Sequence, residues 1–108
     1  MAVDPKTMKP KLSTVTGGLS GPAIKPVALR MVWQTARAVK IPVIGMGGIM
    51  NGDDALEFIM AGAVAVQIGT ATFIEPRTAL SAIISIDSFL SERKLDSLGN
   101  IIGIINRI

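Results

Sequence analysis

The stretch that decides the fold is IPVIGMGGIMNGDDALEFIMAGAVAVQIGT, residues 41–70. It contains two short apolar runs, residues 41–46 and 63–68, each typical of a strand buried on both faces of a parallel sheet. Each run is followed directly by glycine, at position 47 and at position 69. A helix is expected between them, because Asn51 is a good N-cap, Gly62 a good stop, and the intervening apolar residues share one face. That face is formed by Ala55, Leu56, Ile59 and Met60.

The flanking segments extend this pattern. Pro76 opens a further expected helix, whose apolar positions are Leu80, Ile83, Ile84 and Leu90. Residues 97–108 are expected to form a frayed helix. Strand, glycine turn and helix, repeated twice, predict a parallel α/β unit.

The N-terminal part is less regular. We expect an irregular or hairpin segment over residues 1–16, with weak strand alternation at 12–16, and then a glycine-rich loop, TGGLSGPAI, at 16–24. Because a proline disfavours helical geometry in the residue before it, Lys25 is expected outside the helix that runs from Pro26 to Val39. Trp33 is predicted to pack along that helix, and the methionines to fill the core.

Composition excludes several functions. The 108 residues hold one domain at most, and without Cys or His they can form no disulfide, thiolate nucleophile, Ser-His-Asp triad or Cys/His zinc site. A net charge of +3 with 4% aromatic residues suits a small anionic ligand better than a nucleic acid. No apolar run reaches the ~18 residues of a membrane span, so a soluble, cytoplasmic protein is expected. Asp53, Asp54 and Glu57 crowd one helical turn, but we interpret them as partners of the helix dipole and predict no metal site.

The glycine turns carry the functional signal. Gly47-Gly48 and Gly69-Thr70 follow the two predicted strands, at the carboxyl ends where α/β folds gather ligands. Backbone amides of such turns, with the Thr70 hydroxyl, could hold an oxyanion. Glycines that only permit tight turn angles remain the alternative. Met50 breaks the dinucleotide-binding fingerprint, and no P-loop is present.

Three segments together resemble a known family. TGGLSGPAIKPVALRM at 16–31, IPVIGMGGI at 41–49 and AVQIGTATF at 65–73 are similar to the class 1 dihydroorotate dehydrogenases, especially type 1B. The resemblance implies an FMN-binding (β/α)8 TIM barrel that oxidises dihydroorotate to orotate in pyrimidine biosynthesis, with an iron-sulfur flavoprotein as electron-transfer partner. It further implies that Gly21 meets the flavin region, that Gly47 and Gly48 offer amides to the FMN phosphate, and that Gly69 and Thr70 complete the phosphate cup.

The chain is shorter than a complete barrel of ~250 residues. We therefore expect residues 1–108 to be a single incomplete domain, the C-terminal portion of the barrel with the phosphate half of the flavin site. The catalytic Cys of this class is absent, so no catalytic residue is assigned. The chain alone is expected to be inactive, and to oligomerise or aggregate. Two alternatives are a fragment related to the FMN domain of dihydropyrimidine dehydrogenase and a non-catalytic partial barrel that binds a phosphorylated ligand.

Overall fold

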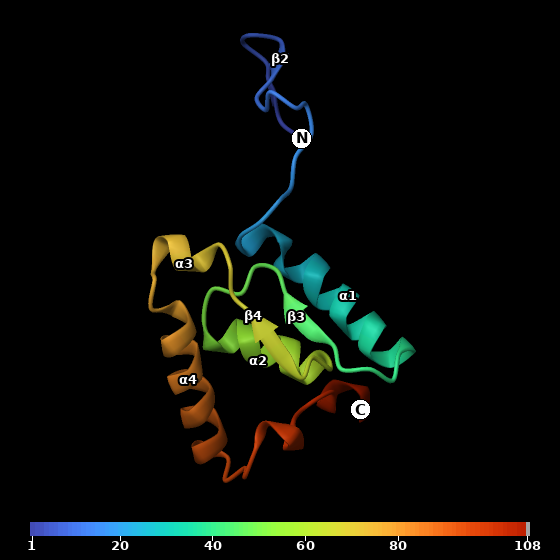
Figure 1. The fold of residues 1–108 in the computed structure, drawn as a ribbon, viewed down its shortest axis with the longest axis vertical. Helices are drawn as coiled ribbons and strands as arrows, with labels where there is room; N and C mark the ends of the chain where they lie inside the picture. The colour runs from blue at the N-terminus through green and yellow to red at the C-terminus, as the bar shows by residue number, and fades with distance from the viewer. Residues whose placement is uncertain (108) are drawn as a thin grey trace.

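The computed structural model describes residues 1–107, in which two parallel strands are flanked by helices (Figure 1). Strand β3 (Ile44–Met46) pairs in parallel with β4 (Ala65–Gln67), in the register Ile44 to Ala65 and Met46 to Gln67. The parallel pairing was predicted, although both strands are shorter than the apolar runs that contain them. Parallel strands alternating with helices are the repeating unit of an α/β barrel.

Helix α2 (Gly52–Ala61) connects the two strands and forms the centre of the core. Asn51 caps it by accepting a hydrogen bond from the amide of Asp54 at 2.9 Å, and Gly62 ends it at a φ of 124°. Both ends were predicted. The helix packs against α1 (Lys25–Ala38) and α4 (Thr78–Glu92), so it is buried on more than one side.

Two clusters of side chains make up the core around α2. The first cluster includes Phe58 and the second includes Ile59, and both side chains are almost completely buried. The predicted apolar face is therefore confirmed, and Phe58 adds a second buried face that the sequence pattern did not indicate. The residues buried in the two clusters are Val32, Ile49, Ala55, Phe58 and Ala63, and Leu56, Ile59 and Ile101.

Helix α1 begins one residue earlier than predicted, and Lys25 has helical angles of φ −50° and ψ −53°. The expectation that Pro26 excludes Lys25 from the helix was wrong. A short 3₁₀ helix, η1 (Pro22–Ile24), runs directly into α1, so the backbone is already helical when it reaches Lys25. The preference imposed by a following proline is a tendency, and a continuous helical segment overrides it here.

The strand predicted at residues 12–16 is also wrong, because residues 12–15 form turns and bends and Thr16 has no regular structure. A two-stranded antiparallel hairpin precedes them, formed by β1 (Val3–Asp4) and β2 (Lys9–Pro10). In Figure 1 this hairpin, in blue, extends away from the helices. The radius of gyration of 16.7 Å exceeds the ~13 Å expected for a chain of this length, in keeping with that extension.

A four-residue helix, α3 (Ala71–Ile74), follows the turn after β4 and was not predicted. The next helix, α4, starts at Thr78, two residues after Pro76. The C-terminal tail forms two 3₁₀ helices, η2 (Leu98–Asn100) and η3 (Ile104–Arg107), instead of a frayed α-helix. Position 108 of that prediction lies outside the described residues.

The expectation that the first strand is buried on both faces was wrong, and the apolar residues of α4 are mostly exposed. On β3, only Gly45 is buried, while Ile44 and Met46 are about half exposed, because no third strand covers them among residues 1–107. On α4, the buried residues are Thr78 and Ala82, and of the apolar face formed by the positions named from the sequence only Leu90 is partly buried. The exposed members of that face are Leu80, Ile83 and Ile84.

Of the six methionines, four are exposed and so do not fill the core: Met1, Met8, Met31 and Met46. Trp33 is only partly buried, and its ring lies 4.6 Å from the Arg37 guanidinium.

Candidate functional site

A pocket of about 630 Å³ opens at the carboxyl ends of β3 and β4, and the predicted glycine turns form part of its wall. The turn after β3 contributes Gly47 and Gly48, and the turn after β4 contributes Gly69 and Thr70. Because the strands are parallel neighbours, both turns lie at the same end of the sheet, as predicted. Gly21, from the glycine-rich loop before α1, lines the same pocket. All five predicted site residues are therefore brought together, while their role in ligand binding remains a prediction.

Gly21 and Gly48 meet at the start of α1. Gly48 has a φ of 75°, and a Cβ atom there would lie only 2.8 Å from the Gly21 carbonyl oxygen and 2.8 Å from the Lys25 amide nitrogen. Gly21 itself has a φ of 83° and a ψ of −171°, a region open essentially to glycine alone. Gly48 is therefore required by the packing of the two loops, and Gly21 by its backbone angles, whether or not a ligand binds.

Gly69 differs from these positions, because a Cβ atom built on it would have no neighbour within 4 Å. Its lack of a side chain is not needed for packing. A glycine in a pocket wall can also serve binding, because the missing side chain lets a ligand come close to the backbone. A substitution at Gly69 therefore distinguishes a glycine that admits a ligand from a glycine that only permits a tight turn.

The pocket offers donors suited to a phosphate. Neither the Gly48 amide nor the Gly69 amide donates to a carbonyl elsewhere among residues 1–107. The hydroxyl-bearing residues Ser20 and Thr70 also line the wall, which contains no charged side chain within the described part of the chain. Backbone amides and hydroxyls are the groups that hold phosphates in glycine-rich loops. The residues present therefore suit a phosphate group.

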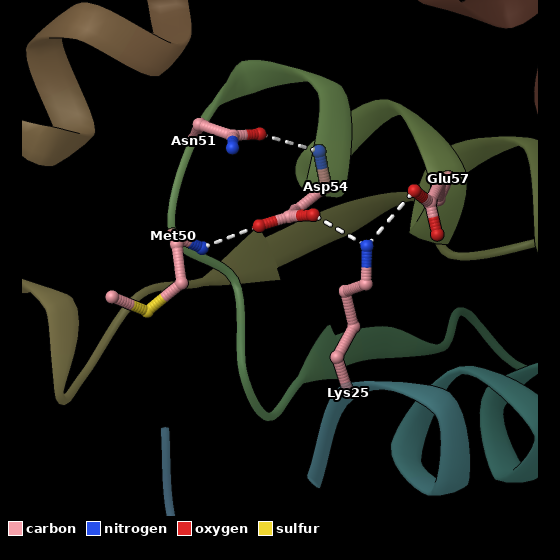
Figure 2. Close-up of polar contacts among 5 residues, drawn as sticks. All are labelled: Lys25, Met50, Asn51, Asp54 and Glu57. Atoms are coloured by element: carbon pink, nitrogen blue, oxygen red, sulfur yellow. Dashed lines mark hydrogen bonds and ion pairs between the residues drawn. The ribbon is translucent and has the colours of Figure 1, made fainter. Parts of the chain in front are cut away.

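Next to the pocket, Lys25 forms two ion pairs with α2 (Figure 2). Its ammonium nitrogen lies 2.5 Å from Oδ1 of Asp54 and 2.9 Å from Oε1 of Glu57. The second oxygen of Asp54, Oδ2, accepts a hydrogen bond of 2.8 Å from the Met50 amide. The Asp54 side chain is only 12% exposed, so it is a nearly buried carboxylate with a cation on one oxygen and a backbone donor on the other.

The electrostatics of the pair follow from these contacts. Burial raises the pKa of the Asp54 carboxyl, but the hydrogen bonds from Lys25 and from the Met50 amide outweigh burial, so that pKa lies below its ordinary value. The hydrogen bond to Asp54, followed by the one to Glu57, raises the pKa of the Lys25 ammonium. Both groups are therefore charged at neutral pH.

Sequence reasoning missed this pair. It placed Asp54 in the first turn of α2 as a partner of the helix dipole, which is correct but incomplete. Lys25 lies 29 positions before Asp54 in the sequence. It was also expected to precede the helix in which it lies, so no local sequence pattern indicated a contact between Lys25 and Asp54. Within residues 1–107 there is no cluster of acidic side chains that could hold a metal ion. None of the helices formed by those residues combines the length and the apolar character that a membrane crossing requires.

Comparison with known proteins identifies the family. A family model described as dihydroorotate dehydrogenase matches residues 1–90. The catalytic subunit of dihydroorotate dehydrogenase B (NAD(+)) from Citrifermentans bemidjiense is 58% identical over 103 residues, which are 95% of this chain and 34% of that protein. The protein of the same name from Bacteroides fragilis is 57% identical over the same shares of the two chains.

The fold gives the same result. The crystal structure of dihydroorotate dehydrogenase from Eimeria tenella, in complex with ferulenol, superposes with a TM-score of 0.79 at 26% identity and covers 97% of this chain and 29% of that one. The two strands and their helices thus correspond to part of an α/β barrel. The chain spans about a third of the length of the curated relatives that it matches. From the family match, the identities and the fold together, the chain belongs to the dihydroorotate dehydrogenase family.

Proposed function

We propose that this chain supplies the FMN phosphate-binding part of a dihydroorotate dehydrogenase, an enzyme that oxidises dihydroorotate to orotate in pyrimidine biosynthesis. The observation that carries the proposal is the convergence of Gly21, Gly47, Gly48, Gly69 and Thr70 on one pocket at the carboxyl ends of two parallel strands. Ligands of α/β barrels bind at that end of the strands. The family is flavin-dependent in general, and the donors of this pocket suit a phosphate.

The name of the relatives supports a partner as well. They are catalytic subunits of a B-type, NAD-linked enzyme, and a catalytic subunit implies a second subunit. We propose that the protein works with an iron-sulfur flavoprotein that passes electrons from FMN to the final acceptor. These relatives also favour dihydroorotate over the dihydropyrimidine substrate of the alternative considered above.

The proposal is tested by comparing FMN with riboflavin, which has the same ring but no phosphate. Titration of the purified chain, followed by quenching of flavin fluorescence, should give a lower Kd for FMN than for riboflavin. Gly69→Ala places a methyl group in open space, so the fold should persist while the phosphate loses its approach to the backbone. We expect the Kd for FMN to rise about tenfold, the equivalent of one hydrogen bond to a charged group, with no change for riboflavin.

Gly18→Ala is the matched control. A Cβ atom at Gly18 also has no neighbour within 4 Å, but Gly18 does not line the pocket, so FMN binding should not change. Equal affinities of the unaltered chain for FMN and riboflavin would contradict a phosphate site. A Gly69→Ala variant with unchanged FMN affinity would remove Gly69 from it.

A further inference from the structure

Lys25 and Asp54 hold the glycine turn after β3 at both of its ends. At one end, Gly48 rests on the first residue of α1, close enough that a Cβ atom would lie 2.8 Å from both Cβ and the amide nitrogen of Lys25. At the other end, the Met50 amide donates to Oδ2 of Asp54. The ion pair between the two side chains closes this arrangement, as Figure 2 shows for Lys25, Asp54 and Met50.

The Lys25 ammonium is not itself part of the pocket wall. It is directed toward α2, where Asp54 and Glu57 engage it (Figure 2). Gly48 and Met50, by contrast, both line the pocket. Lys25 therefore cannot be assigned as a phosphate ligand. Lys25 instead influences the pocket indirectly, because it contacts the turn from Gly47 to Met50 and that turn lines the pocket.

Charge gives the pair a second effect on the same turn. The Asp54 carboxylate is nearly buried and hydrogen-bonded to a residue of the pocket wall, so an uncompensated negative charge there would repel an anionic ligand. Lys25 neutralises that charge at 2.5 Å. Glu57 is 45% exposed, and water screens its charge more effectively.

We propose that Lys25 and Asp54 are positioning residues of the phosphate subsite, which fix the turn from Gly47 to Met50 and cancel the carboxylate charge beside it. The inference rests on the proposed function, because it assumes that the pocket holds a phosphate. It assigns to the pair no contact with the ligand.

The test measures Kd for FMN and for riboflavin on the full chain. Lys25→Met should raise the Kd for FMN about tenfold and leave that for riboflavin unchanged, because only the phosphate meets the displaced turn and the exposed charge. Lys40→Met is the matched control, since it removes the same charge from an exposed position beyond the far end of α1, ~20 Å away. It should change neither Kd.

A double variant distinguishes the effect of the unpaired Asp54 charge from the effect of a displaced turn. Lys25→Met with Asp54→Asn leaves no uncompensated buried carboxylate beside the turn, while the Asn side-chain oxygen can still accept from the Met50 amide. Glu57 also loses its partner, but its side chain is 45% exposed, so water screens its charge. Its preference for FMN should lie between those of Lys25→Met and the unaltered chain. If Lys25→Met alone does not fold by circular dichroism, the double variant carries the test, and its FMN preference must fall below that of the unaltered chain.

The outcomes are distinct. A Lys25→Met variant with the full preference for FMN, or with both affinities reduced in parallel, would overturn the positioning role. An unaltered chain with no preference for FMN would instead overturn the proposed function.

Discussion

Asp54 makes three hydrogen bonds, one through its backbone amide and two through its carboxylate. Its amide donates to the cap residue Asn51, its Oδ2 accepts from Met50, and its Oδ1 accepts from Lys25. Removing one partner from such a nearly buried carboxylate leaves a charge without compensation, which costs more than an exposed ion pair contributes. The residue therefore links the start of α2 to the start of α1.

The stability that Asp54 provides depends on pH in a defined direction. Because the pKa of the folded carboxyl lies below its ordinary value of 3.8, the ionised form stabilises the fold. That contribution is present above pH 3.8 and is lost as the pH falls below it, through the pKa of the folded protein. For Lys25, whose pKa is raised, the contribution is complete below pH 10.5 and is lost as the pH rises above it.

We expect Asp54→Asn, which mimics the protonated carboxyl, to lower the free energy of unfolding at pH 6 by about 1 to 3 kcal/mol. Urea denaturation of both proteins between pH 6 and pH 2.5 measures the difference. It should shrink as the pH drops below 3.8, because the unaltered chain then loses the same interaction. A difference that stays constant over this range would show that Asp54 does not titrate in this way.

Individual residues were predictable where their signal is local. Asn51 and Gly62 bound α2 as expected because caps and stops act within one turn. The pocket residues were found because parallel strands bring their carboxyl ends together. Lys25 was missed because its partner lies on another helix, and helix contacts are set by packing.

At the scale of elements, the contact between α2 and α4 is unusually close at one point. A Cβ atom on Gly52, the first residue of α2, would lie 2.4 Å from Cβ and 2.5 Å from Oγ of Ser85 on α4. Gly52 is therefore kept small by its neighbour, not by a special backbone angle. Small residues on both helices allow α4 to pack tightly against the helix that carries Asp54.

Gly52→Ala should destabilise the chain by about 1 to 3 kcal/mol, the usual cost of overpacking, because the Ser85 Cβ atom cannot move without shifting α4. Thermal melting followed by circular dichroism measures the effect. The matched rescue is Gly52→Ala with Ser85→Gly, which removes both clashing atoms and should recover part of the loss. The recovery is limited by the ~1 kcal/mol that glycine costs within a helix. A Gly52→Ala variant as stable as the unaltered chain would mean that the helices separate easily.

The same close packing explains which element predictions were wrong. Helical spacing correctly predicted that α4 exists. Most of its named apolar residues are nevertheless exposed, because α4 packs against α2 through Ser85, Ile86 and Leu90. The helix α3 was missed for a different reason. It has only four residues, and a single turn has no periodicity to detect.

For the whole molecule, the exposed apolar residues lie where a complete barrel has neighbouring strands and helices. In a closed barrel each strand pairs on both sides, whereas β3 and β4 pair only with each other among residues 1–107. Ile44 and Met46 are consequently half exposed, and Phe73 on α3 is 90% exposed. The family and fold class could be predicted from the sequence because the strand and turn pattern is local. The burial pattern could not, because it depends on which neighbours are present.

We predict that the chain self-associates through these surfaces. Sedimentation velocity at increasing concentration should give masses above that of one chain, because a helix face with Leu80, Ile83 and Ile84 exposed gains free energy when it is covered. Leu80→Glu with Ile84→Glu should shift the distribution toward the monomer. The control, Ser88→Glu with Ser91→Glu, places the same two charges at exposed polar positions of α4, and each double variant takes the net charge from +3 to +1. The control should therefore associate more than the apolar-face variant does, if the apolar contact and not the net charge drives assembly. A monomer at every concentration, with a sharp cooperative melt, would instead show that two strands and their helices suffice for a stable fold without the rest of the barrel.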